Sequence, residues 1–446
     1  MNTPKLIAAR ALFVWASGLF FINLAWAGIP VQHWTQPNGA RVYLVESPAI
    51  PMVDVQIDLD AGGRRDPAAQ PGLANLMAGS TAQGVRASDA GPALDENQLS
   101  EAWADLGASF GGSASADRMS FGLRSLTYPD LLDKALSLAA RQLGEPAFPE
   151  ALWLRDRPKL IASLKEANTR PATLAARAFS SAVYGSHPYG YEPNEASLLR
   201  TNVQQLRDLH ARVLRACAVQ VSIVGALNRA QADVLVTKLL ARLPQSGCAK
   251  LPPVPEVQPL AAASEQRLAF PSAQAHVLLG QPGYRRNDPD FFALTVGNHI
   301  LGGGGFTARL TEEVREKRGL TYSVYSYFSP GLHAGAFTIG LQTRPDQAEQ
   351  ALTLVREVLA KFVAQGPTEQ ELQAAKNNLI GGFALRIDSN KKLLDNVANI
   401  AWNGLPLDYL DTWTQQVDKL TTEQVRTAMA RVLQPERMAA VVLGAP

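Results

Sequence analysis

Apolar runs of two kinds alternate along the chain and predict a fold that mixes strands with helices. The segments ARVYLVES, MVDVQIDLDAG and AVQVSIVGAL alternate apolar and polar positions or are apolar throughout, as strands are. SEAWADLGA, LLDKALSLAARQLG and TNVQQLRDLHARVL have a helical period and follow a polar cap or turn. Later in the chain, the strand-like LTYSVYSYF and GAFTIGLQT lie close together. This order predicts an α+β fold of mostly antiparallel sheets with helices packed on one face.

The pattern also repeats over a long distance. ARVLRACAVQVSIVGAL begins at position 211 and ARVLQPERMAAVVLGAP at position 430, an offset of 219. The same offset relates Pro149-Glu150 to Thr368-Glu369. A constant offset over several elements indicates two copies of one domain. The first copy is expected at 28–243 and the second at 267–446, joined by a linker at 244–266 that holds five prolines.

The first 27 residues have the pattern of a secretory signal peptide. Lys5 and Arg10 precede the apolar run ALFVWASGLFFINLAWA, which ends in Ala25-Trp26-Ala27. Cleavage is expected after Ala27, and a retained membrane anchor is the alternative. No comparable apolar run follows in the sequence, so the mature chain is predicted to be exported, or periplasmic, and to lack a membrane span.

The net charge and the two cysteines bear on possible partners and on a possible disulfide. A net charge of +2 gives no sign of a nucleic-acid partner. Cys217 and Cys248 belong to no Cys/His cluster. In an oxidising compartment they could form a disulfide or remain two free thiols, and the sequence leaves both possibilities open.

The most informative stretch is LGGGGFTARLTEEVREKRGLTYSVYSYF, at 301–328. It has no Gly-Lys-Ser/Thr triplet, which argues against a phosphate-binding loop. The glycines are instead expected to form a tight turn before the helix TARLTEEVREKRG. Arg315 then lies near the end of that helix, and Tyr322 lies seven residues later at the start of a strand. On the sequence pattern alone, Arg315 would be assigned to a solvated charged face.

This stretch resembles the C-terminal domain of the pitrilysin-type zinc peptidases, or inverzincins. That family includes the mitochondrial processing peptidases and many bacterial two-chain enzymes. The resemblance rests on Ala308-Arg309-Leu310 and on Arg-Glu-Lys-Arg-Gly-Leu-Thr-Tyr-Ser-Val at 315–324, with HPYG at 187–190 as weaker support. It implies a clamshell-like fold in which Arg315 binds peptide at a cleft and Tyr322 stabilises the oxyanion.

The family's zinc motif, His-x-x-Glu-His on a helix, is degenerate in this chain. Its lead-in Gly72-Leu73-Ala74 is present, but Asn75 replaces the first His, Ala78 the base Glu and Gly79 the second His. Glu166 matches the third ligand. One carboxylate cannot hold a catalytic Zn²⁺, and no two of the six histidines stand three or four positions apart. No metal is therefore expected on this chain, and His187 is expected to make a structural turn contact.

The resemblance implies the zinc-less subunit of a heterodimeric metallopeptidase, inactive alone. A homologous chain with His-x-x-Glu-His would bind the zinc, and Arg315 and Tyr322 would act in trans on peptide substrates. The alternative is a non-catalytic structural or peptide-binding pseudoenzyme of the same fold. An autonomous peptidase is the weakest reading, because all three motif groups are lost.

Overall fold

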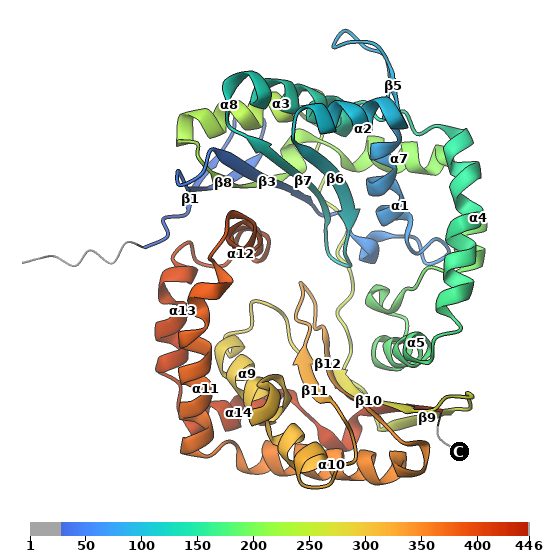
Figure 1. Cartoon of the computed structure of the whole chain (residues 1–446), viewed down its shortest axis with the longest axis vertical. Helices are drawn as coiled ribbons and strands as arrows, with labels where there is room; N and C mark the ends of the chain where they lie inside the picture. Colours follow the sequence, from blue (N-terminus) through green and yellow to red (C-terminus); the bar gives the residue numbers. More distant parts are fainter. Residues whose placement is uncertain (1–27, 445–446) are drawn as a thin grey trace, which may run out of the picture.

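The computed structural model describes residues 28–444, so the predicted signal peptide at 1–27 lies outside the described part. Two sheets face each other, each with most of its helices on the outer side, and the N-terminal sheet is the upper one in Figure 1. Strands and helices are mixed, and most strand pairs are antiparallel. The predicted α+β fold class is confirmed.

The N-terminal sheet has six strands in the order β1-β2-β8-β3-β7-β6, and only the β2–β8 pair is parallel. Its strands are β1 (Gln32–Thr35), β2 (Arg41–Glu46), β3 (Met52–Leu59), β6 (Ser109–Ala114), β7 (Met119–Leu126) and β8 (Gln220–Gly225). The accompanying helices are α1 (Leu73–Ser80), α2 (Glu96–Asp105), α3 (Pro129–Gly144), α4 (Glu150–Ala167), α6 (Glu195–Arg200), α7 (Val203–Val213) and α8 (Arg229–Leu239). A small hairpin is formed by β4 (Gly84–Val85) and β5 (Leu94–Asp95).

The C-terminal sheet has five strands in the order β11-β12-β10-β13-β9, and only the β13–β9 pair is parallel. Its strands are β9 (Ser264–Leu268), β10 (Ala275–Pro282), β11 (Val324–Phe328), β12 (Ala336–Thr343) and β13 (Ala439–Leu443). The outer helices are α9 (Phe291–Asn298), α10 (Ala348–Gln365), α11 (Glu369–Gly381), α13 (Tyr409–Asp418) and α14 (Thr422–Val432).

Equivalent elements in the two halves begin at the offset seen in the sequence. Helix α3 begins at Pro129 and α10 at Ala348, while β8 begins at Gln220 and β13 at Ala439. The local signals recur as well, because α7 and α14 both begin with a capping box, built on Asn202 and on Thr421.

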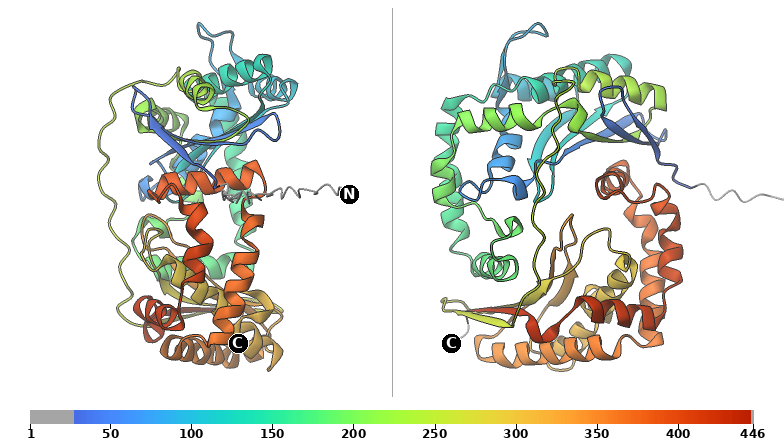
Figure 2. Two further views of the ribbon diagram at one scale, coloured as in Figure 1. Left: turned by 90° about the vertical axis from the view of Figure 1, so that its left-hand side faces the viewer. Right: turned by 180° about the vertical axis from the view of Figure 1, so that it is seen from behind.

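The two halves exchange one helix each. Helix α5 (Pro171–Tyr184) follows α4 in the chain but packs on β10 and β13 of the other sheet, and α12 (Asn390–Asn403) packs on β8 and β3. Both helices lie between the sheets in Figure 1 and in the reverse view of Figure 2. The exchange explains why β8 and β13 are buried along their whole length, since each is covered on both faces.

The predicted linker runs in an extended path along one side of the molecule up to residue 263, and its last three residues, 264–266, belong to β9 (Figure 2). Its start is fixed by a disulfide between Cys217 and Cys248, with a Cα–Cα distance of 6.1 Å. The structure therefore selects the bridge over two free thiols. Further along, the carbonyl of Pro252 accepts a 2.7 Å hydrogen bond from Arg65.

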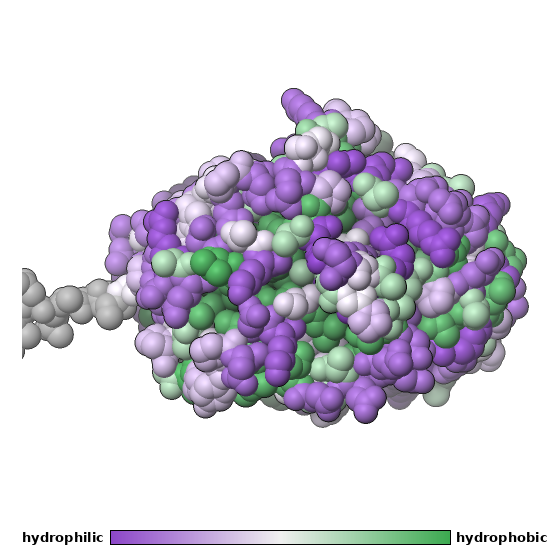
Figure 3. Space-filling view, turned by 90° about the horizontal axis from the view of Figure 1, so that it is seen from above, coloured by the Kyte–Doolittle hydropathy of each residue, from purple (hydrophilic) through white to green (hydrophobic). Residues whose placement is uncertain are grey.

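The surface over the N-terminal half mixes hydrophilic side chains with smaller apolar patches (Figure 3). Among the helices of residues 28–444, none is both long enough and apolar enough to cross a membrane.

Candidate functional site

Arg315 lies between two aromatic rings near the edge of the C-terminal sheet. Its guanidinium carbon is 4.7 Å from the ring centre of Phe306 and 5.0 Å from that of Tyr322. Both rings are strongly exposed, Phe306 at 72% and Tyr322 at 83%. A guanidinium between two rings gains cation–π attraction and has a fixed plane, while its N–H edge stays able to donate hydrogen bonds. We call Phe306, Arg315 and Tyr322 the arginine cluster.

The Gly-rich turn places Phe306 in this cluster. Gly305 has a φ of +64°, which a side chain would strain, and a Cβ built on it would meet no atom within 4 Å. The chain then forms a helical segment that ends as a π-helix over Thr311–Glu316. This segment carries Arg315, whose Nε lies 3.4 Å from the carboxylate of Glu316.

Tyr322 lies in a bend before the strand rather than at its start. The strand was expected to begin near Leu320, but β11 begins at Val324. The reason is Thr321, whose hydroxyl donates to the carbonyl of Gln342 at 2.6 Å and accepts from the backbone N–H of Ser323 at 3.1 Å. These bonds replace strand pairing at this point, and the bend they fix leaves the Tyr322 side chain exposed.

The sequence motif contained Arg315 and Tyr322 but did not identify Phe306. The sequence feature that could have identified Phe306 is its position directly after four glycines, as a large apolar residue in a turn expected to be exposed. An aromatic ring and an arginine on the same surface can form a cation–π contact, which is how Phe306 joins Arg315.

Helix α1 carries the degenerate zinc motif, and its first turn is fixed by a glycine cap and by a buried carboxylate. Gly72 caps it in the left-handed conformation, with a φ of +95°. The buried carboxylate of Asp66 accepts hydrogen bonds from the backbone N–H groups of Gly72, at 2.8 Å, and Ala74, at 2.9 Å. Burial raises the pKa of Asp66 to about 6, against the effect of these hydrogen bonds. The lead-in of the motif thus has a structural role here.

The three motif positions offer no donor set for zinc. Asn75 is exposed, and its Oδ1 accepts a 3.0 Å hydrogen bond from the backbone N–H of Ala114, at the end of edge strand β6. Ala78 is completely buried, and Gly79 faces open space. Within residues 28–444, no group of three or more His, Cys, Asp or Glu side chains could hold a metal ion. The residues present therefore do not fit the zinc of the peptidases that the sequence resembles.

Glu166, at the position of the third zinc ligand, forms an ion pair with a neighbouring arginine. Glu166 is exposed near the end of α4 and pairs with Arg170 at 2.5 Å. A different carboxylate of α4, Asp156, accepts a 3.3 Å hydrogen bond from Gln83, three residues after α1 ends. Hydrogen bonds from Arg155 lower the pKa of Asp156 to about 2. Asp156 lies about 15 Å from Glu166 along the helix axis and was not identified from the sequence.

Two histidines far apart in the sequence meet where the halves join. The rings of His187 and His333 are 5.4 Å apart. His187 accepts from the Tyr189 N–H through Nδ1, at 3.1 Å, and its Nε2 lies 2.9 Å from the carbonyl of Pro255. The predicted turn contact of His187 is confirmed, and with both nitrogens engaged this ring has no lone pair for a metal.

The same place holds a wider polar network. His333 Nδ1 lies 2.8 Å from Glu256 of the linker, and the Tyr189 hydroxyl donates to Asp117 at 2.6 Å. Asp117 also pairs with the buried Arg64 at 3.1 Å. We call His187, Tyr189, His333, Glu256 and Asp117 the junction network, because it joins a turn of each half to the linker.

Within residues 28–444, the two sheets face each other (Figure 1) and helix α1 carries no zinc donor at the three motif positions. The chain belongs to the peptidase M16 family. The family model described as "Peptidase M16 inactive domain" matches residues 200–379, which include the arginine cluster. The crystal structure of a peptidase M16 inactive domain from Pseudomonas fluorescens is 35% identical, with a TM-score of 0.87 over 93% of this chain and 98% of that chain. The resemblance inferred from the sequence is confirmed.

Two curated relatives match this chain over most of their own length. An uncharacterized zinc protease of Mycobacterium leprae is 26% identical over 92% of this chain and 91% of its own. A protein of Helicobacter pylori named as a non-peptidase homolog is 26% identical over 87% of this chain and 88% of its own. The relatives thus include proteins named as proteases and one named as a non-peptidase.

Proposed function

We propose that this chain is the zinc-less subunit of a two-chain M16 peptidase and is inactive alone. A homologous chain with His-x-x-Glu-His binds the zinc, and Arg315 and Tyr322 act on the peptide at that zinc. The observation that carries the proposal is the contrast within the chain. Arg315 lies against the exposed rings of Phe306 and Tyr322, while Asn75, Ala78 and Gly79 supply no metal ligand.

The chemistry of the cluster suits this role. The N–H edge of Arg315 can donate two hydrogen bonds to a peptide carbonyl or a terminal carboxylate. The hydroxyl of Tyr322 can donate to the oxygen that becomes negative when the amide carbon is attacked. The zinc chemistry itself belongs to the partner chain, and this chain contributes binding and charge stabilisation.

The exposure of the cluster favours a partner. Two aromatic rings are exposed to water beside one cation. Covering this surface would lower the free energy of the system. A peptide and a second chain would cover it together. The name of the Helicobacter relative supports a chain without peptidase activity of its own.

Export is part of the proposal. The first 27 residues have the signal-peptide pattern, and the disulfide between Cys217 and Cys248 suits an oxidising compartment such as the periplasm.

Reconstitution tests the proposal. The chain alone, an M16 relative with His-x-x-Glu-His from the same organism alone, and the two mixed are assayed on an unfolded peptide. The proposal expects cleavage by the mixture and little by either chain alone. If the zinc-bearing relative alone cleaves as fast as the mixture, this chain has no catalytic part, and the alternative of a scaffold or peptide-binding pseudoenzyme replaces the proposal.

A further inference from the structure

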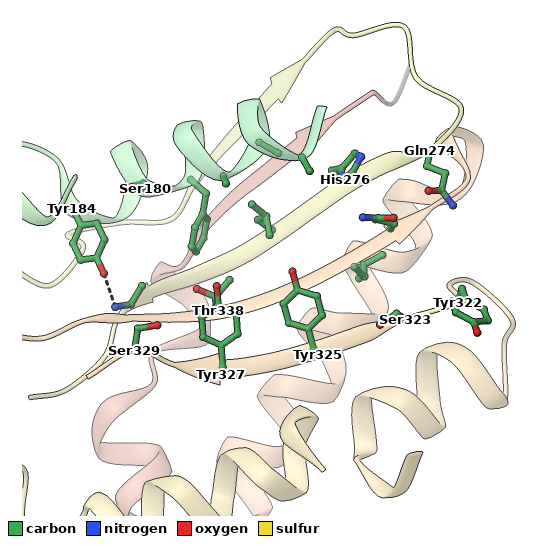
Figure 4. A pocket seen from close by; sticks show the side chains of 18 residues that line it. Ser180, Tyr184, Gln274, His276, Tyr322, Ser323, Tyr325, Tyr327, Ser329 and Thr338 are labelled. Atoms are coloured by element: carbon green, nitrogen blue, oxygen red, sulfur yellow. Dashed lines mark hydrogen bonds between the residues drawn. The ribbon is translucent and has the colours of Figure 1, made fainter. Parts of the chain in front are cut away.

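A groove of about 670 Å³ begins at Tyr322 and runs across the inner face of the C-terminal sheet. Helix α5 forms one wall, and strands β10, β11 and β12 form the floor (Figure 4). The side chains of Tyr325, Tyr327 and Thr338 point into it from the sheet. Because Tyr322 belongs to both the arginine cluster and the groove, the two are continuous.

The groove is aromatic and has no charge. None of its 18 lining residues, all within the described part of the chain, is Asp, Glu, Lys or Arg. The rings of Tyr325 and Tyr327 stack with centres 5.9 Å apart. Burial raises the pKa of Tyr325 and lowers the pKa of His276, so both side chains are neutral near pH 7.

Most hydrogen-bonding groups in the groove are still available. Among the lining side chains drawn in Figure 4, the one hydrogen bond is donated by the Ala336 N–H to the Tyr184 hydroxyl at 2.8 Å. The hydroxyls of Tyr325, Tyr327 and Thr338 have no partner among the other lining residues. A ligand with both apolar groups and amide groups would match these walls.

The duplicated half provides an internal comparison. Gly122 of β7 and Gly340 of β12 are equivalent, and each pairs with an edge strand. Opposite them lie Gly111 in the N-terminal half and Tyr325 in the C-terminal half. A Cβ on Gly340 would come within 2.5 Å of the Tyr325 ring, so this glycine lets the ring lie flat on the sheet.

The other inner-face positions differ in the same sense. In the N-terminal half, the neighbouring inner-face pair is Asp54 opposite Arg124, and their side chains form an ion pair at 2.7 Å. The equivalent pair in the C-terminal half is His276 opposite Gln342, which carries no ion pair. The corresponding N-terminal cavity is about 310 Å³ and is lined by Asp54, Arg124 and Lys391. An uncharged aromatic groove is therefore a property of one half and not of the fold in general.

We propose that this groove is a subsite for a peptide segment with uncharged aromatic or aliphatic side chains. The identification of the ligand as a peptide rests on the proposed function, and the continuity with Tyr322 places the segment beside the bond held by the arginine cluster. The walls select against Asp, Glu, Lys and Arg, because a charge here would lose water without gaining an opposite charge among the lining residues. Aromatic side chains would stack on the tyrosines.

The test uses the mature chain alone, without any partner, and two capped pentapeptides. The probe has the sequence Gly-Phe-Leu-Phe-Gly and its control Gly-Asp-Ser-Asp-Gly, and calorimetry measures their affinity. Ala176→Glu places a carboxylate on the groove wall at an exposed position of α5. Tyr327→Ser gives the edge strand the residue found at Ser113 in the other half. Ala104→Glu, at an exposed position of α2, is the matched control.

The proposal expects the Phe/Leu peptide to bind at least about tenfold more tightly than the Asp/Ser peptide. Ala176→Glu and Tyr327→Ser should each weaken that binding by roughly tenfold, and Ala104→Glu by less than about twofold. Equal affinity for both peptides, no binding of either, or wild-type affinity in both groove variants would overturn the subsite. Since no partner is present, such a failure leaves trans catalysis standing, and a failure of trans catalysis leaves the measured groove binding standing.

Discussion

Arg315 lies between two exposed rings, one of which belongs to Phe306. The cation–π contact at 4.7 Å limits the directions in which the guanidinium can point. A ring on the other side, from Tyr322, completes the restraint at 5.0 Å. Under the proposed function, Phe306 would be a positioning residue that orients Arg315 toward the peptide.

Phe306→Ala should lower kcat/KM of the reconstituted pair by between about twofold and thirtyfold, because a cation–π contact contributes roughly 0.5–2 kcal/mol. Steady-state kinetics on a short peptide measures it, with chain association checked by gel filtration. Leu385→Ala removes a side chain that is 67% exposed outside the cluster and is the control. A variant with the kcat/KM of wild type would remove Phe306 from the site.

Ala78, at the position of the base Glu in the zinc motif, is packed in the core of the N-terminal half. This side chain is fully buried, and the Ala78 carbonyl lies 2.8 Å from where a Cβ on Gly112 would be. Ala78→Glu should therefore lower the free energy of unfolding by roughly 2–5 kcal/mol, since it buries a carboxylate without a partner. Gly79→His, which faces open space, should stay within about 1 kcal/mol of wild type.

Urea denaturation of both variants checks this expectation. Equal stability of Ala78→Glu and wild type would show that the helix still accommodates the base Glu. The predicted result would instead mean that restoring the zinc site needs repacking of the neighbouring strands as well as the three substitutions.

At the scale of single residues, the degenerate zinc motif and the pair Arg315 and Tyr322 could be recognised from the sequence. Both patterns depend only on residue type at fixed spacing. Phe306 and Asp156 were missed because their role comes from which element they meet in space. Asp156 has no motif of its own, and its contact with Gln83 depends on how α4 packs beside the end of α1.

Among the elements, the junction network is where pH should act. The groups facing His187 are His333 of the β11–β12 loop, Glu256 of the linker, Asp117 of the β6–β7 turn, Tyr189 of its own turn and Tyr184 of α5. Burial is the main cause that lowers the pKa of His187 below 6.5. The folded state therefore prefers the neutral ring, and its stability falls as the pH drops below about 6.5.

His187→Gln tests this directly, because a glutamine can accept from Tyr189 and donate to Pro255 without titrating. Between pH 7.5 and 5, the melting temperature of wild type should fall more steeply than that of the variant. His276→Gln, at a half-buried position outside the network where burial also lowers the histidine pKa, measures how much of the slope any half-buried histidine contributes, and His187→Gln should flatten the curve more than it does. Parallel curves for wild type and His187→Gln would show that His187 does not couple protonation to folding.

Helix and strand identities were largely predictable from periodicity and caps, as the capping boxes at Asn202 and Thr421 show. The start of β11 was not, because the hydrogen bonds of Thr321 compete with strand pairing through a side chain whose partner, Gln342, lies on another strand. Periodicity contains no information about that long-range bond.

Over the whole molecule, the repeat was visible in the sequence but the helix exchange was not. Helices α5 and α12 begin at Pro171 and Asn390, at the repeat offset, yet each packs on the sheet of the other half. Their apolar faces predict burial without saying against which sheet. The exchange matters for function because it places α5 as one wall of the groove beside Tyr322.

The two halves differ in the features that they carry. The N-terminal half keeps the lead-in of the zinc helix as structure, through Asp66 and Gly72. The C-terminal half keeps the arginine cluster and the aromatic groove. The proposed assembly, in which another chain supplies the metal, would use this division.

The measurement that tests this most directly is the turnover of the reconstituted pair with Tyr322→Phe in this chain. The substitution removes one hydroxyl and keeps the ring beside Arg315. The account predicts that kcat falls by roughly 10²–10³, as for the loss of one oxyanion donor, while association of the chains is unchanged. A kcat equal to that of the wild-type pair, with association intact, would contradict the claim that this chain takes part in the chemistry.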